Sequence, residues 1–194
     1  MNKCEELSFL TETKGLAGVL MDIQPKLTMS INEATMEVLL DSIDLFIDSM
    51  ASFSIPLLVT EQAPEKLGGS LNRIAEKISE STIIKKNTFS AFGDSVFCDW
   101  VELNEIKHLL LSGIETSICI YLTAIDALKK GLGVTVISDC VLSRRDADAT
   151  TALSQLSQAG ATVLSLETII YSLMSSSNHP EFKKISNLVK ARAF

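Results

Sequence analysis

The chain has 194 residues, of which 46% are hydrophobic and 21% charged, a composition typical of a globular protein. Its net charge of −7 disfavours binding to nucleic acid or to an anionic membrane, because both partners require a basic face. No stretch approaches the ~18 uninterrupted apolar residues of a membrane-spanning helix. The N-terminus, MNKCEELSFLTETKG, lacks the apolar core of a secretory signal, so we expect a cytoplasmic protein.

Apolar, strand-like runs alternate with helix-patterned segments along the whole chain. In chain order the predicted elements are strand 15–23, helix 32–52, strands 55–60 and 82–84, helix 94–104, strand 109–111, a helix after Cys119 that ends before Gly131, strand 134–138, a helix that closes near Gly160, strand 161–164, and helices 167–174 and 180–191. Ser143 and Asp146 have the spacing of a capping box ahead of the helix that closes near Gly160.

Continuous apolar strands that alternate with helices are typical of a parallel sheet covered on both faces. The sequence contains no internal repeat, low-complexity tract or linker. It therefore predicts one α/β domain over residues 1–194. The expected architecture has three layers, α-β-α, around a six-stranded, mostly parallel, Rossmann-like sheet with helices on both faces.

Polar residues follow several of the predicted strands at their carboxyl ends. In such sheets ligands bind beyond these ends, where the strand order switches direction. Asp22 ends the first strand, residues 60–62 end the second, and Lys85 and Lys86 follow the third. Cys119 lies in the segment after the fourth strand. We expect Asp22, Lys86 and Cys119 to meet in one pocket.

Cys119 has the setting of a reactive thiol. A short apolar run ends at Gly113, and a polar stretch then opens a helix that carries Cys119 in its first turn. The positive end of the helix dipole and a nearby ammonium both favour the thiolate, so we expect a lowered pKa for Cys119. The competing interpretation is a small buried hydrophobic residue, which is common for free cysteine.

The remaining cysteines and histidines indicate no metal site and no disulfide. Cys4, Cys98 and Cys140 share no CxxC spacing with Cys119 and have no histidine nearby in the pattern that zinc sites need. We interpret these three as incidental thiols. His108 and His179 are expected to be structural. We predict no metal and no cofactor.

Six segments, in this order along most of the chain, resemble the isochorismatase-like cysteine hydrolase superfamily, in particular its isochorismatase domain-containing and YcaC-related branch. They are VLMDIQPKL with Asp22, LLVTEQAPEKLG, KNTFSAF with Lys86, GIETSICIYLTAIDAL with Cys119, DCVLSRRDADATTAL, and the tail HPEFKKISNLVK. The lysine three residues before Phe89 is the family lysine; Lys85 beside it is the alternative. The resemblance also implies a cis peptide bond at Ile114–Glu115.

The resemblance implies a catalytic triad of Asp22 as base, Lys86 as the holder of charge, and Cys119 as nucleophile. It implies metal-independent hydrolysis of a small C–N compound, amide or imide-like, through a thioester-type intermediate on Cys119. Nicotinamidases of this superfamily bind a metal with histidines after the second strand, whereas TEQAPEKLGG has none. Members that cleave isochorismate lack the cysteine.

Residues near the strand ends are candidates for substrate binding: Gln24, Glu61, Gln62, Phe89, Ile114, Glu115 and Thr116. For Glu61 and Gln62 capping of the next segment is equally open, and for Thr116 an N-cap role is favoured. Phe92 is expected in the wall or core. Arg144 and Asp148 are expected to form a structural ion pair or a subunit contact rather than catalytic contacts.

Two other functions stay open. One is a non-catalytic scaffold or oligomeric interaction protein that retains the fold, and the other is a metal-assisted, nicotinamidase-like amidase. We expect a small-molecule substrate and a homo-oligomer, a dimer or larger, as is usual in the family. The apolar C-terminal helices suit that assembly. We expect neither nucleic acid nor a membrane as partner.

Overall fold

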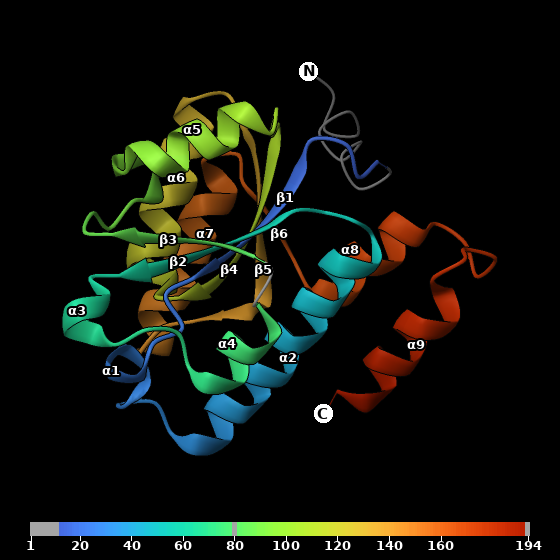
Figure 1. Ribbon diagram of the computed structural model, residues 1–194, viewed down its shortest axis with the longest axis horizontal. Helices are drawn as coiled ribbons and strands as arrows, with labels where there is room; N and C mark the ends of the chain where they lie inside the picture. The colour runs from blue at the N-terminus through green and yellow to red at the C-terminus, as the bar shows by residue number, and fades with distance from the viewer. Residues whose placement is uncertain (1–11, 79–80, 193–194) are drawn as a thin grey trace.

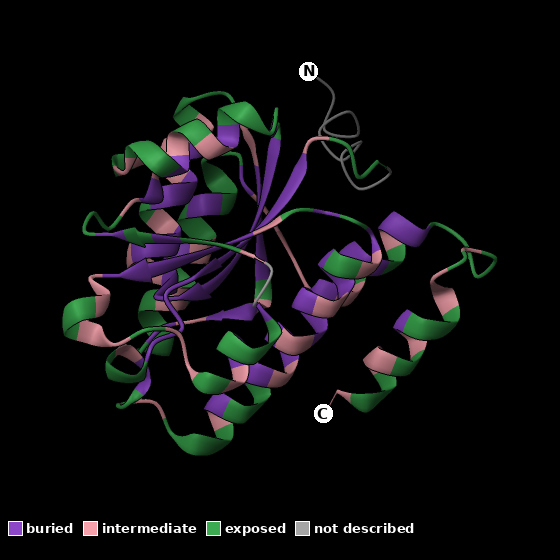
Figure 2. Ribbon diagram, in the orientation of Figure 1, coloured by how far each residue is buried: buried purple, intermediate pink, exposed green. Residues whose placement is uncertain are grey.

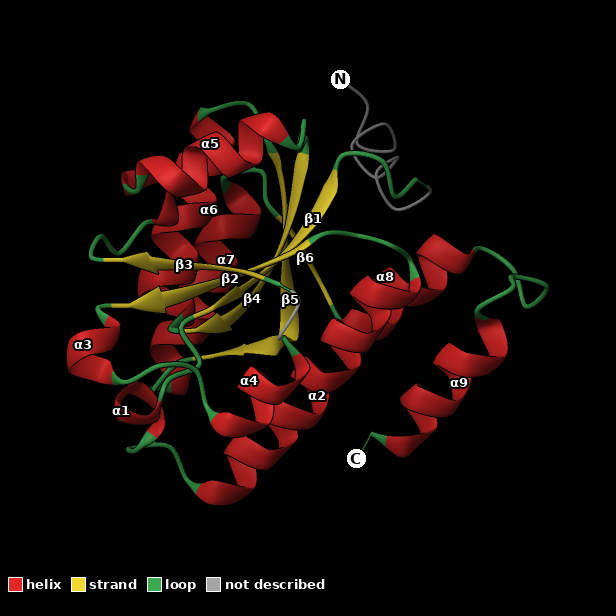
Figure 3. Cartoon of the chain, viewed as in Figure 1, coloured by secondary structure: helices red, strands yellow, loops and turns green. Residues whose placement is uncertain are grey.

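The computed structural model describes residues 12–78 and 81–192. Six strands form one sheet in the order β3-β2-β1-β4-β5-β6, and every pairing between neighbours is parallel. Helices cover both faces of this sheet (Figure 3). The predicted α/β fold is confirmed. The strands are β1 (Leu16–Met21), β2 (Leu57–Gln62), β3 (Thr82–Lys86), β4 (His108–Ile114), β5 (Gly133–Leu142) and β6 (Thr162–Leu164).

The long helices divide between the two faces (Figure 1). On one face lie α2 (Glu33–Ser52), α4 (Asn72–Lys77), α8 (Leu166–Met174) and α9 (Phe182–Ala191), and on the other lie α5 (Ser95–Leu103), α6 (Tyr121–Lys129) and α7 (Asp146–Gln158). The short helices α1 (Pro25–Thr28) and α3 (Pro64–Leu67) contact each other. None of the described helices is long and apolar enough to cross a membrane.

Strand β1 shows why the strands are apolar without interruption: all six of its residues are buried. Leu16 and Leu20 point into the core beneath α2, whereas Val19 and Met21 point into the core beneath α5 and α6. This alternation follows from the two-residue period of a strand. Figure 2 shows the central strands, β1 and β4 among them, as the buried middle layer of the molecule, whereas the edge strands β3 and β6 are less buried. The hydrophobic effect therefore acts on both faces of the sheet.

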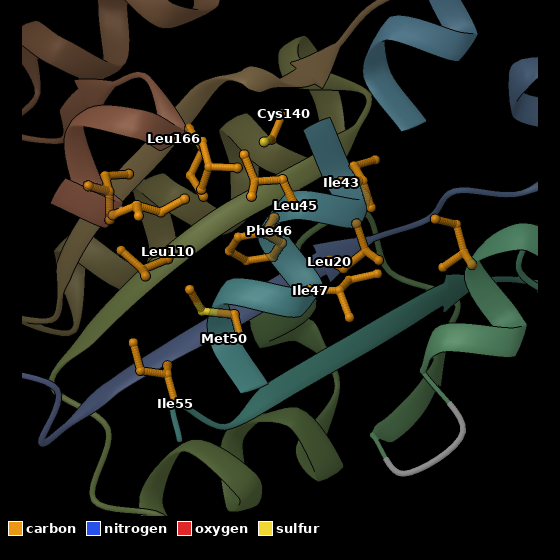
Figure 4. Packing of buried hydrophobic residues seen from close by; sticks show 14 of the residues in the cluster. Leu20, Ile43, Leu45, Phe46, Ile47, Met50, Ile55, Leu110, Cys140 and Leu166 are labelled. Atoms are coloured by element: carbon orange, nitrogen blue, oxygen red, sulfur yellow. The ribbon is translucent and has the colours of Figure 1, made fainter. Parts of the chain in front are cut away.

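The core beneath α2 also receives the C-terminal helices. Phe46 of α2 lies among side chains from the sheet and from α8, including Leu110 and Leu166 (Figure 4). Ile170 of α8 and Ile185 of α9 are fully buried in the same cluster. These side chains of the C-terminal helices pack against α2 within the chain.

Gly113 allows β1 and β4 to approach closely beside the end of the sheet. It pairs with Met21, and the register between β4 and β5 shifts at this point. Its φ of +111° is one that residues with a side chain rarely adopt. A Cβ atom on Gly113 would lie 2.6 Å from the backbone nitrogen of Met21. The path of the chain from β4 towards Cys119 therefore requires glycine.

We expect Gly113→Ala to lower the free energy of unfolding by about 3 kcal/mol or more, because it combines a backbone clash with an unfavourable φ. Gly131→Ala is the matched control: its φ is +79° and a Cβ there would meet nothing within 4 Å. The control should cost about 1 kcal/mol. Urea unfolding measures both variants, and equal losses would show that the clash at Gly113 is absent.

Candidate active site

The polar residues predicted from the strand ends lie along one edge of the sheet. Asp22 follows β1, Gln62 ends β2 and Lys86 ends β3. Cys119 lies beyond β4 in η3 (Thr116–Ile120), a π-helical turn that continues into α6. Strands β1 and β4 are neighbours, and the chain proceeds outwards from them in opposite directions. This edge is the switch point at which α/β sheets bind ligands.

Asp22 and Lys86 form a buried ion pair. Lys86 Nζ lies 2.7 Å from Asp22 Oδ2, and both side chains are 0% exposed. The second carboxylate oxygen, Oδ1, accepts a hydrogen bond of 2.7 Å from Thr60 Oγ1. Lys86 also donates to Gln62 Oε1 at 2.7 Å. Lys85 is exposed, so Lys86 rather than Lys85 is the lysine that pairs with Asp22.

The Cys119 side chain interacts with this pair. The residue is 6% exposed, and burial together with the charge of Asp22 raises its pKa to about 12. The ammonium of Lys86 acts in the opposite direction but does not prevail. The expected lowering of the pKa is therefore wrong for the resting protein. The raised pKa favours the protonated thiol at neutral pH.

The loop after β5 holds the turn that precedes Cys119. The Ser117 backbone N–H donates to Ser143 Oγ at 3.2 Å. Arg144 Nε lies 2.5 Å from Glu115 Oε1. The predicted capping box is therefore wrong, because Ser143 contacts Ser117, and α7 has Arg145 at its N-cap without a side-chain hydrogen bond.

Two further expectations concern this turn. The Ile114–Glu115 peptide bond is cis, as the resemblance implied. The expected ion pair of Arg144 forms, but its partner is Glu115 rather than Asp148. The fold brings Glu115 to Arg144 from the end of β4.

A cavity of ≈ 420 Å³ opens over Cys119, within the usual range for small-molecule sites. Asp22 and Lys86 do not line it; they lie buried behind the thiol. Three of the predicted binding residues line the cavity: Gln62, Phe89 and Glu115. Arg144, for which a structural role was expected, also lines the cavity. The cavity is lined further by residues that the sequence patterns did not indicate: Lys26, Leu27, Met29, Ser30, Leu67 and Ile118.

Gln24 and Glu61 hold the loops that shape this cavity. Gln24 Nε2 donates to the carbonyls of Gln62, at 3.1 Å, and of Gly68, and its Oε1 accepts from the Gln62 N–H at 2.7 Å. Glu61 Oε1 accepts from the N–H of Ser70 at 2.7 Å and from its hydroxyl at 2.9 Å. Neither side chain lines the cavity. Both therefore brace the loop after β2.

Ile114 and Thr116 are fully buried beside the cavity. Ile114 belongs to the core cluster beneath α2. The N-cap interpretation of Thr116 is wrong, since Glu115 occupies that position and makes no side-chain capping bond. The Thr116 hydroxyl has no hydrogen-bond partner among the described residues.

The remaining candidates lie away from the cavity. His108 Nε2 lies 2.8 Å from Thr135 Oγ1, and burial lowers the pKa of His108 to about 4. The ring of His179 meets Phe53 edge-on. Cys98 and Cys140 are free thiols outside the cavity, and Cys4 falls outside the described residues. Residues 12–78 and 81–192 contain no cluster of three or more His, Cys, Asp or Glu arranged to hold a metal ion.

Three of the missed lining residues belong to two short helices. Lys26 and Leu27 belong to α1, and Leu67 belongs to α3; each helix has four residues and begins with proline. Proline at the first position is the available sequence signal, because one helical turn is too short to show periodicity. Thr60 lies at the predicted end of the second strand, but the sequence indicated no specific role for it.

The sequence matches the model of the isochorismatase domain over residues 17–168. Isochorismatase domain-containing protein 2 of Danio rerio is 32% identical over 178 residues, which cover 91% of this chain and 88% of that protein. A structure described as the MAR1 ribonuclease of Caenorhabditis elegans is 31% identical and covers 94% of both chains, with a TM-score of 0.84.

A more distant structure shows the same fold. It is the YcaC gene product of Escherichia coli, described as an octameric hydrolase of unknown specificity. It is 20% identical, covers 93% of this chain and 94% of its own, and gives a TM-score of 0.78. The match to the domain model and the relatives above 30% identity together establish that this chain belongs to the isochorismatase domain family of hydrolases.

Proposed function

We propose that the protein hydrolyses a small amide or imide-like compound through a thioester on Cys119, with Asp22 as the base and without a metal. One observation carries this proposal: a buried cysteine lines a ligand-sized cavity and interacts, behind it, with a buried aspartate–lysine pair. An acid, an amine and a thiol in contact are the groups that nucleophilic catalysis without histidine requires.

In the first step Cys119 is acylated. Burial and the charge of Asp22 raise the pKa of Cys119, so ionisation of the thiol before the attack is energetically costly. Proton transfer to Asp22 during the attack avoids this cost. Sγ bonds to the substrate carbonyl carbon while its proton passes to Asp22. The C–N bond then breaks, and Asp22 returns the proton to the leaving nitrogen.

In the second step water hydrolyses the thioester. Asp22 takes a proton from the water as its oxygen attacks the acyl carbon, the C–S bond breaks, and Asp22 returns the proton to Sγ. Lys86 Nζ lies 2.7 Å from Asp22 Oδ2 and holds the carboxylate in place during these transfers. Backbone N–H groups at Cys119 and near Glu115 are the proposed donors to the oxyanion.

The contacts of Asp22 favour a mechanism without a metal. Its two oxygens are occupied by Lys86 and Thr60, so the positive charge beside the carboxylate is an ammonium. The loop after β2, TEQAPEKLGG, contains no histidine. A metal-assisted, nicotinamidase-like activity is therefore the weaker alternative.

The burial of the ion pair disfavours a purely structural role. Replacement of a buried ion pair by well-packed apolar residues is often neutral or stabilising, so a scaffold has little physical reason to keep Asp22 and Lys86. A homo-oligomer, a small-molecule substrate and a cytoplasmic location remain proposals. The octameric state described for the YcaC relative supports the first of these.

We expect a panel of small amides and imides to contain substrates whose turnover Cys119→Ala lowers at least about 10³-fold, since the covalent route is then lost. Cys98→Ala is the matched control, because Cys98 is a free thiol outside the cavity. It should change the rate less than about twofold. Release of product is measured at saturating substrate after dialysis against EDTA, which should not slow the wild type.

Retained turnover in Cys119→Ala, or loss of wild-type turnover on dialysis with recovery on added zinc, would contradict the mechanism. Absence of turnover across the panel, with Cys119 accessible to alkylation, would favour the scaffold.

Asp22→Asn should lower the pKa of Cys119 while it abolishes hydrolysis. The substitution removes the negative charge that opposes the thiolate and leaves the ammonium of Lys86 beside it. Labelling of Cys119 by iodoacetamide is followed by peptide mass spectrometry from pH 6 to 11. We expect the variant to show a midpoint within this range, about one to three pH units below the wild-type pKa of about 12, whereas labelling of the wild type should still be rising at pH 11. Below pH 9 the variant should therefore label faster than the wild type.

Asp99→Asn, a substitution of an exposed aspartate on α5, controls for the change in net charge and should leave the midpoint unchanged. Cys98 in the same samples serves as the internal reference. A midpoint that Asp22→Asn leaves in place or raises would disprove the electrostatic role of Asp22.

A further inference from the structure

We infer that a second cavity, where α5 and α6 end, binds a short peptide with free termini and apolar side chains. The dipeptide leucyl-leucine is a simple example. The two helices lie on the same face of the sheet (Figure 1). This cavity shares no lining residue with the one over Cys119, so the site is separate from the proposed hydrolase reaction. Its volume of ≈ 440 Å³ is within the usual range for small-molecule sites.

Four charged side chains line this cavity without pairing with one another. Glu102 lies on α5 and Glu105 in the turn after it, whereas Lys107 precedes β4 and Lys130 follows α6. All four residues are exposed. None of them forms an ion pair with any residue in the part of the chain that the structure describes. The cavity therefore presents two carboxylates and two ammonium groups to a ligand.

Glu105 occupies a backbone position that favours glycine. Its φ is +51°, in the left-handed region. The Glu105 N–H donates to the carbonyl of Glu102 at 3.0 Å, and the N–H of Ile106 donates to the carbonyl of Val101 at 3.0 Å. This pair of hydrogen bonds ends many helices, usually with glycine between them. Helix α6 ends in the same way, and there Gly131 has the positive φ. A glutamate at the end of α5 is unfavourable for the backbone, but it places a carboxylate at the cavity.

An aromatic ring holds the ammonium of Lys130 at the cavity. Lys130 Nζ lies 5.6 Å from the centroid of the Phe92 ring. Phe92 in turn meets the fully buried Phe97 edge-on, with 4.9 Å between the ring centroids. A cation–π contact leaves the N–H donors of the ammonium free for a carboxylate. Because the group is oriented before a ligand arrives, binding costs less entropy.

The rest of the cavity is mainly apolar. Its apolar lining consists of Phe92, Val101, Ile106 and Leu132, and two of these, Val101 and Ile106, are buried. This surface accommodates apolar side chains. Cys98 also lines the cavity, is partly exposed, and donates from Sγ to the carbonyl oxygen of Phe92 at 3.4 Å. Its thiol is therefore a natural reporter of occupancy.

A dipeptide matches this arrangement of charges. Its ammonium suits Glu102 and Glu105, where the negative end of the α5 dipole adds to the attraction, and its carboxylate suits Lys107 and Lys130. A free amino acid carries both charges on one carbon, whereas a dipeptide separates them by one further residue of about 3.5 Å. The charges of the lining sum to zero, which favours a zwitterion over a ligand with a net charge.

Leucyl-leucine with free and with blocked termini tests the inference. The peptides are titrated calorimetrically into Cys119→Ala, which removes the proposed nucleophile and its thiol. The free dipeptide should bind at least about tenfold more tightly than acetyl-leucyl-leucine, which lacks the ammonium, or leucyl-leucine amide, which lacks the carboxylate. It should also slow alkylation of Cys98, followed by peptide mass spectrometry, in proportion to occupancy.

Lys130→Gln, added to Cys119→Ala, locates the carboxylate of the ligand. It should weaken the free dipeptide about tenfold or more and leave leucyl-leucine amide within about twofold. Lys129→Gln is the matched control, because Lys129 is the neighbouring exposed lysine and does not line the cavity. It should alter binding of the dipeptide by less than about twofold.

Glu105→Gly separates a role in binding from a role in the fold. Because glycine suits the left-handed backbone at this position, the variant should unfold at an equal or higher concentration of urea than its parent. It should nevertheless bind the dipeptide about tenfold or more weakly.

Any of four results would overturn the inference. They are failure of leucyl-leucine to bind, blocked peptides that bind as tightly as the free one, binding that leaves alkylation of Cys98 unchanged, and unaltered binding by Lys130→Gln and Glu105→Gly.

Discussion

The buried ion pair between Asp22 and Lys86 is the interaction on which the rest of the site depends. Removal of both charges from water is costly, and the pair persists only because further polar groups surround it. Thr60 donates to the carboxylate, and Gln62 accepts from the ammonium. The four residues come from the carboxyl ends of β1, β2 and β3, which lie side by side in the sheet. The register of these three strands therefore determines the geometry of the site.

The same burial determines the protonation state of Cys119, the proposed nucleophile. A thiol in an exposed first turn of a helix would ionise readily, but Cys119 is enclosed and faces a carboxylate, so it stays protonated. Asp22 thus has two effects: it raises the pKa of Cys119 in the resting protein, and it is the acceptor for the proton during attack in the proposed mechanism. A protonated resting thiol is also less open to unwanted alkylation and oxidation.

Much of the fold could be predicted from the sequence, because strands buried on both faces leave continuous apolar runs, as β1 and β4 do. The placement of Asp22 and Lys86 at one edge followed from the rule for parallel sheets. The partners of individual loop residues could not be predicted. Ser143 has capping spacing, yet it binds Ser117 from another element. The pKa of Cys119 depends on enclosure, which no local pattern reveals.

For polar residues near the strand ends, too, the residue type could be read from the sequence but the contact partner could not. Gln24 has a polar side chain of the kind that contacts ligands. Its amide nitrogen and its amide oxygen nevertheless both form hydrogen bonds with the backbone of Gln62. Arg144 was expected in a structural ion pair or a subunit contact, whereas the fold pairs it with Glu115 at the cavity. In both cases the residue type correctly indicated a polar contact, but the role of the residue depends on the partner that the fold brings to it.

The most direct measurement is the intact mass of the protein quenched in acid during steady-state turnover of an amide substrate. A thioester on Cys119 predicts a species heavier than the free protein by the acyl group, located by peptide mapping to the segment containing Cys119, and released by hydroxylamine. Turnover without any such adduct, or an adduct that maps to another residue, would contradict the proposal that Asp22 and Lys86 serve a nucleophilic cysteine.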